Sequence, residues 1–176
     1  MSPIPIVVCG RNPNIAKSVS KALLPEYDGT SLIHQHPSFL CQPRCIFPTA
    51  SGKRLIVTVI HINLSVEQAV SDIPFILSSK IPPDSSSNIG SQNYGARPVA
   101  IGVGGGFNDG MFAQMKDACG EGRVVWARTD MASAAKMPDL SDHEAYGTAT
   151  GERVKKCLNE LRVGKEGGKI EGVYYF

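Results

Sequence analysis

Hydrophobic residues occur along this chain in short continuous runs that alternate with stretches of helical periodicity. Residues 4–10 form an apolar, β-branched run, which is typical of a strand buried on both faces of a parallel sheet. Asn12 and Pro13 then suit the N-cap and the first position of a helix, and Pro25 ends it. The apolar face of this helix is predicted to comprise Ile15, Val19 and Leu23.

The same order of strand and helix repeats three more times. The further predicted strands are residues 55–62, 99–103 and 123–127. After the second strand, Ser65 and Gln68 have the spacing of a capping box, and Pro74 is expected to bend or break the helix that they begin.

The two remaining helices have their own start signals. Asn108 or Asp109 caps the helix after the third strand, and Ser141 and Glu144 have capping-box spacing before the last helix. Two glycines are expected to weaken the first turns of that last helix, Gly147 and Gly151.

Four strand-then-helix units predict right-handed crossovers and a mainly parallel sheet of four to five strands. The fold class is therefore α/β, a small Rossmann-like or flavodoxin-like three-layer sandwich, expected as a single domain over residues 1–176. Trp126 is expected in the core, and the aromatic tail 172–176 as an edge strand or packed on the sheet. Two segments lack periodicity: a long loop at 81–98, and an irregular insertion at about 29–53.

Composition and charge narrow the function classes. The chain has 176 residues, of which 42% are hydrophobic and 19% charged, as expected for a globular protein. The net charge of +2 argues against nucleic acid as the main partner, because a phosphate-binding surface needs clustered Lys and Arg. No apolar run approaches the length of a membrane helix, so no membrane partner is expected. Five cysteines, one of them in a buried strand, predict reduced thiols and a cytoplasmic protein.

Ligands of open parallel sheets bind beyond the carboxyl ends of the strands, where the strand order reverses. The first and third strands are the expected neighbours there, and both run into glycine loops that lead to helix N-termini, which favour anions. The predicted ligand-binding residues are Gly10, Arg11, Asn12, Gly104, Gly105, Gly106 and Arg128. The ligand is expected to be a small anion, with a nucleotide as the natural candidate. Neither loop matches a dinucleotide or phosphate-loop motif, so tight turns without a ligand remain the alternative.

Other candidate chemistry is less specific. Four possible zinc ligands, His34, His36, Cys41 and Cys45, match the spacing of no common zinc module, so no metal site is predicted. Cys9 lies near a helix N-terminus that could lower its pKa, but a buried small hydrophobe is its favoured role. The sequence assigns no cofactor and no catalytic residue.

Two alternatives to a small-molecule-binding domain stay open. The first is an interaction or oligomerisation module that uses the 81–98 loop or the aromatic tail to bind a partner or a second copy. The second is a small cofactor-independent enzyme with acid–base residues such as Asp130 or His143 in the cleft.

Several segments together resemble a known group of proteins. They are residues 5–10, 84–91, 104–109, 126–130 and 172–176. With them, the chain resembles a largely uncharacterised group of short fungal proteins described as Rossmann-like or NAD(P)-binding-like. The resemblance implies the α/β fold and supplies no catalytic residues. It excludes roughly residues 29–53, which raises the hypothesis that this segment derives from an unspliced intron; an mRNA that retains the segment would contradict that.

Overall fold

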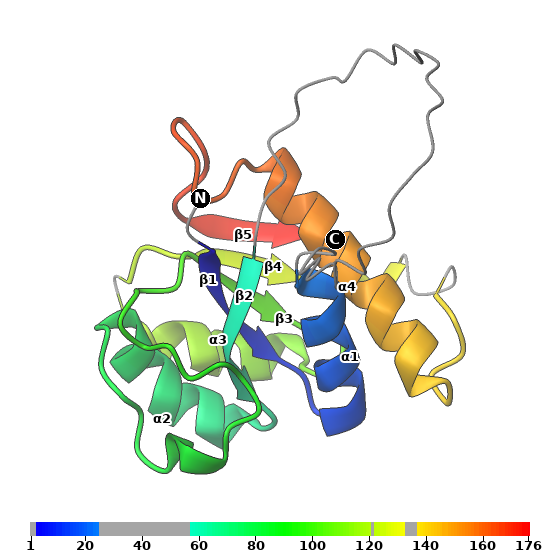
Figure 1. The fold of residues 1–176 in the computed structure, drawn as a ribbon, viewed down its shortest axis with the longest axis horizontal. Coiled ribbons are helices and arrows are strands. Elements are labelled where there is room, and N and C mark those ends of the chain that lie inside the picture. The colour runs from blue at the N-terminus through cyan, green and yellow to red at the C-terminus, as the bar shows by residue number, and fades with distance from the viewer. Residues whose placement is uncertain (1–2, 25–56, 121, 133–136) are drawn as a thin grey trace, which may run out of the picture.

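In the part of the chain that the structure describes, five parallel strands form one sheet with the order β2-β1-β3-β4-β5 (Figure 1). The strands are β1 Ile4–Cys9, β2 Val57–Asn63, β3 Ala100–Val103, β4 Val125–Arg128 and β5 Gly172–Tyr175. This order is the flavodoxin-like one, with the reversal between β1 and β3. The predicted α/β sandwich with its mainly parallel sheet is confirmed, and the aromatic tail forms the edge strand β5.

The computed structural model describes residues 3–24, 57–120, 122–132 and 137–176. The predicted insertion at 29–53, with the candidate zinc ligands, lies outside the described residues.

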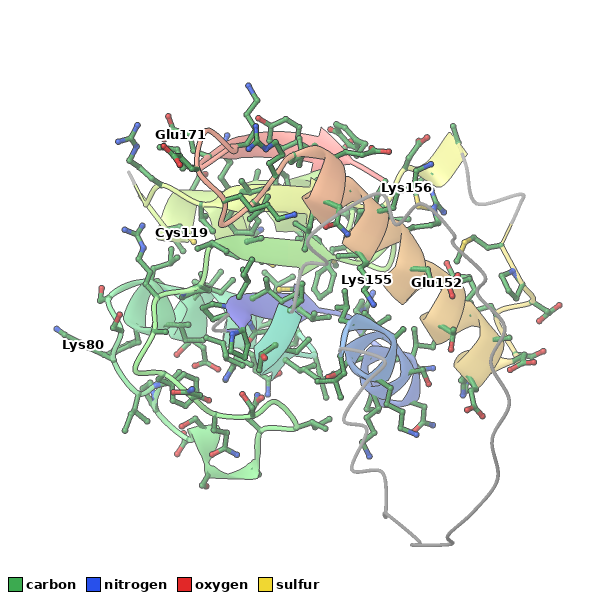
Figure 2. All side chains as sticks on the ribbon, turned by 45° about the horizontal axis from the view of Figure 1, so that its top comes forward. Lys80, Cys119, Glu152, Lys155, Lys156 and Glu171 are labelled. Atoms are coloured by element: carbon green, nitrogen blue, oxygen red, sulfur yellow. The ribbon has the colours of Figure 1, made fainter. Side chains whose placement is uncertain are left out.

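Within the described residues, four α-helices cover the sheet, two on each face (Figure 1). They are α1 Pro13–Leu23, α2 Val66–Leu77, α3 Asp109–Ala118 and α4 His143–Glu160. The core between the sheet and α2 and α3 contains Trp126, which is buried and meets the Phe112 ring edge-on at 5.3 Å. The core between the sheet and α1 and α4 is aliphatic, with Val19 and Leu158 as examples. Figure 2 shows the charged residues Glu152 and Lys156 along α4, where both are exposed.

The caps follow the sequence with one exception. Asn12, Ser65 and Asn108 cap α1, α2 and α3 through their side-chain oxygens. Asp142 caps α4, whereas Ser141 was expected to; Ser141 instead donates its hydroxyl to Asp139. A cap must stand directly before the first helical residue, and α4 begins one residue later than the capping box predicted.

A bend or a break was expected at Pro74, and the helix is not broken there. Helix α2 continues through Pro74 to Leu77. Pro74 lies in the last turn, where its missing N–H costs one hydrogen bond, and the preceding turns are fixed by buried residues such as Ala69 and Ile73.

The fourth crossover has the opposite hand to the first three. The chain steps from β1 to β2 with α1 on one face, and steps back across the sheet to β3 and β4 with α2 and α3 on the other face. It then continues in the same direction to β5, yet α4 lies on the α1 face (Figure 1). The prediction of right-handed crossovers throughout is therefore wrong for the last unit. Long connections, residues 129–142 and 161–171, give the chain enough length for this path.

Two glycines bring α4 into close contact with α1. A Cβ at Gly147 would lie 2.4 Å from Ser18 Cβ, and one at Gly151 would lie 2.6 Å from Ala22 Cβ. Both distances are shorter than real carbon contacts. The two glycines thus allow the backbones to approach, and their role is this contact more than the weakening of α4 that the sequence suggested.

The 81–98 loop covers the outer edge of β2. Ser91 N and Gln92 N donate to Val59 O and Ile60 O, each at 3.0 Å. Asn88 also accepts from Ile62 N at 2.9 Å and donates to Ile62 O at 2.8 Å. This segment therefore satisfies edge groups of the sheet that would otherwise be open to other chains.

The α1–α4 contact predicts the effect of a single methyl group. Gly151→Ala should lower the free energy of unfolding by about 1–3 kcal/mol, because the methyl group overpacks against Ala22. Helix propensity alone predicts the opposite, a gain of about 1 kcal/mol. Urea unfolding measures the difference, with Thr148→Ala at an exposed α4 position as the control, expected within about 0.5 kcal/mol of wild type. A stabilised Gly151→Ala protein would contradict the contact.

Candidate functional site

A cavity of about 450 Å³ opens at the carboxyl ends of β1 and β3, between α1 and α4. Its floor includes Val8 of β1 and Gly102 of β3, and the missing side chain of Gly102 leaves space above the sheet. Helix α1 contributes Val19 to one wall, and α4 contributes Thr150 and Val154 to the other. The cavity therefore lies where the fold class places ligands.

The structure brings six of the seven predicted ligand-binding residues to this cavity. They are Gly10, Arg11, Asn12, Gly104, Gly105 and Gly106. Arg128 is not among the lining residues. Its guanidinium lies 2.9 Å from an Asp109 carboxylate oxygen and 4.3 Å from the centre of the Phe112 ring, on the α3 side of the sheet. Residues in a strand alternate between its faces, so Arg128 is directed away from the cavity while Thr129 lines it.

Sequence reasoning missed much of the cavity wall. The missed residues come from α1, α4 and the connection between β4 and α4, and they include Ile15, Val19, Thr129, Met131, Leu140 and Tyr146. No local signal marks the residues of α4 as site residues, because only the reversed crossover places α4 beside α1.

Side chains pack closely over the two glycine loops. A Cβ at Gly106 would lie 3.2 Å from Arg11 Cδ, so the aliphatic part of Arg11 rests against the Gly106 backbone. A Cβ at Gly105 would lie 3.0 Å from Met131 Sδ. Gly104 N donates to Cys9 O at 2.9 Å and joins the two loops at the sheet edge. These glycines keep the rim of the cavity open.

The helix N-termini at the site are occupied by their own caps. Asn12 Oδ1 accepts from Asn14 N at 2.9 Å and from Ile15 N at 3.4 Å, and Pro13 has no N–H to offer. At α3, Asn108 Oδ1 accepts from Met111 N, and Asp109 adds a negative charge to the first turn. The anion-binding amides on which the sequence argument relied are therefore largely committed within the chain.

A hydrogen bond joins the starts of α1 and α4 beside the cavity. Asn12 Nδ2 lies 3.2 Å from His143 Nε2. Because the oxygen of the Asn12 amide caps α1, its nitrogen is the donor and His143 Nε2 is the acceptor. Neither His143 nor Asp130, the two acid–base candidates, belongs to the residues that line the cavity.

The Cys9 side chain belongs to the core on the α2 and α3 side of the sheet, away from the space between α1 and α4. It is fully buried, and this burial raises the pKa of the thiol to about 12. Asn63 Nδ2 lies 3.9 Å from the sulfur. The neutral thiol is the buried small hydrophobe that the sequence favoured.

A buried polar cluster around His61 lies on the α2 side of the sheet. A register shift between β1 and β2 next to His61 changes the alternation of the strand, and His61 is 1% exposed. Its Nε2 lies 3.1 Å from both Asp72 Oδ2 and Asn63 Oδ1 and 3.2 Å from Asn88 Nδ2. The two oxygens are acceptors and Asn88 Nδ2 already donates to Ile62 O, so we assign the proton to Nε2. Tyr94 Oη, 2.8 Å from Nδ1, then donates to it. The cluster ties β2, α2 and the 81–98 loop together, away from the cavity lining.

Two further searches concern the described part of the chain alone. There, no group of three or more His, Cys, Asp or Glu side chains could hold a metal ion. No helix in the same ranges is long and apolar enough to cross a membrane.

Comparison with known proteins finds a distant fungal relative. No protein-family model and no solved structure matches the chain. The chain is similar to Kojic acid related protein 6 of Aspergillus oryzae, with 26% identity over 162 residues, which cover 90% of this chain and 77% of that protein. This supports the relationship to fungal proteins that the sequence resemblance implied.

The buried His61 predicts how stability depends on pH. Burial lowers the pKa of His61 against the opposing effect of Asp72, so the folded state takes up fewer protons than the unfolded chain below about pH 6.5. The free energy of unfolding is therefore highest above that pH and decreases as the pH falls. Between pH 7.5 and 5.5 the decrease is about 1 kcal/mol.

Urea unfolding at both pH values tests this, with His61→Gln as the comparison. The variant should be less stable at pH 7.5, because it lacks the imidazole of the cluster, and should lose less stability on acidification. Equal losses in the two proteins would show that His61 does not control the pH dependence.

Proposed function

We propose that the chain binds a small organic molecule in the cavity between α1 and α4. The observation that carries this proposal is the cavity itself, about 450 Å³ at the strand-order reversal. Sites for small ligands are concave and mostly apolar, with a few polar groups at defined positions. The lining has this character, since aliphatic side chains and glycines dominate it and Arg11 and Asn12 lie at the β1–α1 loop.

A compact, carbon-rich ligand suits this cavity better than a nucleotide. The volume is at the low end of the range of about 300–1,000 Å³ for ligand sites. A nucleotide phosphate would need free amides at a helix N-terminus, and those of α1 are taken by Asn12. The name of the Aspergillus oryzae relative connects that protein with kojic acid, and a single-ring compound of that kind is small enough for the space.

Closing the rim of the cavity should abolish binding while leaving the fold intact. Gly105 is exposed and has no positive φ, so Gly105→Leu is compatible with the backbone, and its side chain is directed toward Met131 and Thr129 at the cavity. Indole at millimolar concentration serves as an apolar small-molecule probe, and saturation-transfer NMR measures its binding. The wild type should bind it, and the affinity of the variant should be at least tenfold lower, a difference of about 1.4 kcal/mol.

A matched glycine provides the control. Gly110→Leu on α3 adds the same side chain at an exposed position that does not line the cavity, so indole should bind as it does to the wild type. Absence of indole binding to the wild type, or equal binding to the wild type and Gly105→Leu, would contradict the proposal.

A further inference from the structure

The polar groups of the cavity are concentrated at one rim. Inside, the two threonine hydroxyls already have partners, because Thr129 Oγ1 donates to Val103 O at 3.3 Å and Thr150 Oγ1 donates to Tyr146 O at 2.8 Å. The interior therefore offers few hydrogen-bond donors to a ligand, and the part of the ligand that enters it must be apolar.

The rim carries backbone donors without partners. The amides of Arg11, Asn12, Gly105 and Gly106 donate to no group in the part of the chain that the structure describes. Neighbouring amides are committed, since Gly10 N donates to Asn63 O and Phe107 N donates to Gly104 O. The four N–H groups belong to residues that line the cavity, and Arg11, Gly105 and Gly106 are exposed, so these groups are accessible to water and to an oxygen acceptor of a ligand.

The charge at the rim is positive. Arg11 lines the cavity, its aliphatic part is held against Gly106, and its side chain forms no ion pair or hydrogen bond with the described residues. Among the described residues that line the cavity there is no Asp or Glu, and Glu67, which interacts electrostatically with Arg11, does not line it. A negatively charged oxygen at this rim would meet the Arg11 guanidinium and backbone amides that have no partner among the described residues.

We infer that the ligand class is a small organic acid with an apolar body. This inference rests on the proposed function. The body occupies the interior beside Val19 and Val154, and the carboxylate accepts hydrogen bonds at the rim from the Gly105 and Gly106 amides and from Arg11. A carboxylate fits better than a phosphate, because a single arginine and loop amides are present while the first turn of α1 is capped.

A matched pair of probes tests the class. 3-Phenylpropanoate and 3-phenylpropanamide have the same body and differ in charge, and isothermal titration calorimetry at pH 7 measures both dissociation constants. The carboxylate should bind about tenfold more tightly, as expected when one charge-assisted contact replaces a neutral one. Arg11→Met should remove most of this difference, because losing the guanidinium weakens carboxylate binding more than amide binding.

Lys17→Met is the control, because Lys17 is an exposed cation on α1 that does not line the cavity, and its removal should leave both constants unchanged. Equal affinities of the wild type for the two probes would overturn the ligand class, and so would competition by inorganic phosphate as strong as that by the carboxylate. In either case, binding of indole would still support the cavity as a ligand site. If indole, the acid and the amide all fail to bind, the proposed function fails, and this inference fails with it. Circular dichroism of each variant confirms its fold.

Discussion

The contact between α1 and α4 is the interaction on which the rest of the structure depends. Two glycines on α4, Gly147 and Gly151, remove the side chains that would otherwise hold the helices apart. The close approach fixes α4 on the same face of the sheet as α1. Because α4 is held on this face, the crossover from β4 to β5 has the uncommon hand. The long connections on both sides of α4 permit this path.

The cavity is a consequence of that placement. With α4 on the α1 face, the carboxyl ends of β1 and β3 have a helix on either side, and Thr150 and Val154 face Val19 across the space. The glycine loops add a rim that lacks side chains. Two arginines end up with different roles: Arg11 lies at the rim, whereas Arg128 is neutralised by Asp109 and packed on Phe112 on the far side of the sheet.

The sequence predicted the elements and the edge of the sheet where the cavity lies, because those depend on local patterns. Apolar runs marked the strands, Asn12 and Ser65 marked helix starts, and glycine loops after the first and third strands marked the reversal. The position of α4 depends on tertiary packing, so neither its cavity residues nor the purpose of Gly147 and Gly151 could be read from the chain. The prediction that Arg128 binds the ligand was wrong because successive residues of a strand point to opposite faces of the sheet, so Thr129 faces the cavity and Arg128 does not.

The polar cluster around His61 was also beyond sequence reasoning. His61 and Asn63 are recognisable at the end of a strand, but Asp72 comes from a helix and Tyr94 from a loop that has no periodicity. Only the folded chain brings them together. The 81–98 loop gains its order from this cluster and from its hydrogen bonds to the edge of β2, which explains how a Ser-, Asn- and Gly-rich segment has a defined path.

The most direct test of this account is a set of nuclear Overhauser contacts from α4 in isotopically labelled protein. If α4 lies on the α1 face, the Hα protons of Gly147 and Gly151 will show strong contacts to the side chains of Ser18 and Ala22, since the backbones meet there. Contacts from α4 to Phe112 or Met115, on the α3 side of the sheet, would show instead that the last crossover has the common hand. The cavity between α1 and α4 would then not exist, and the binding function built on it would be wrong.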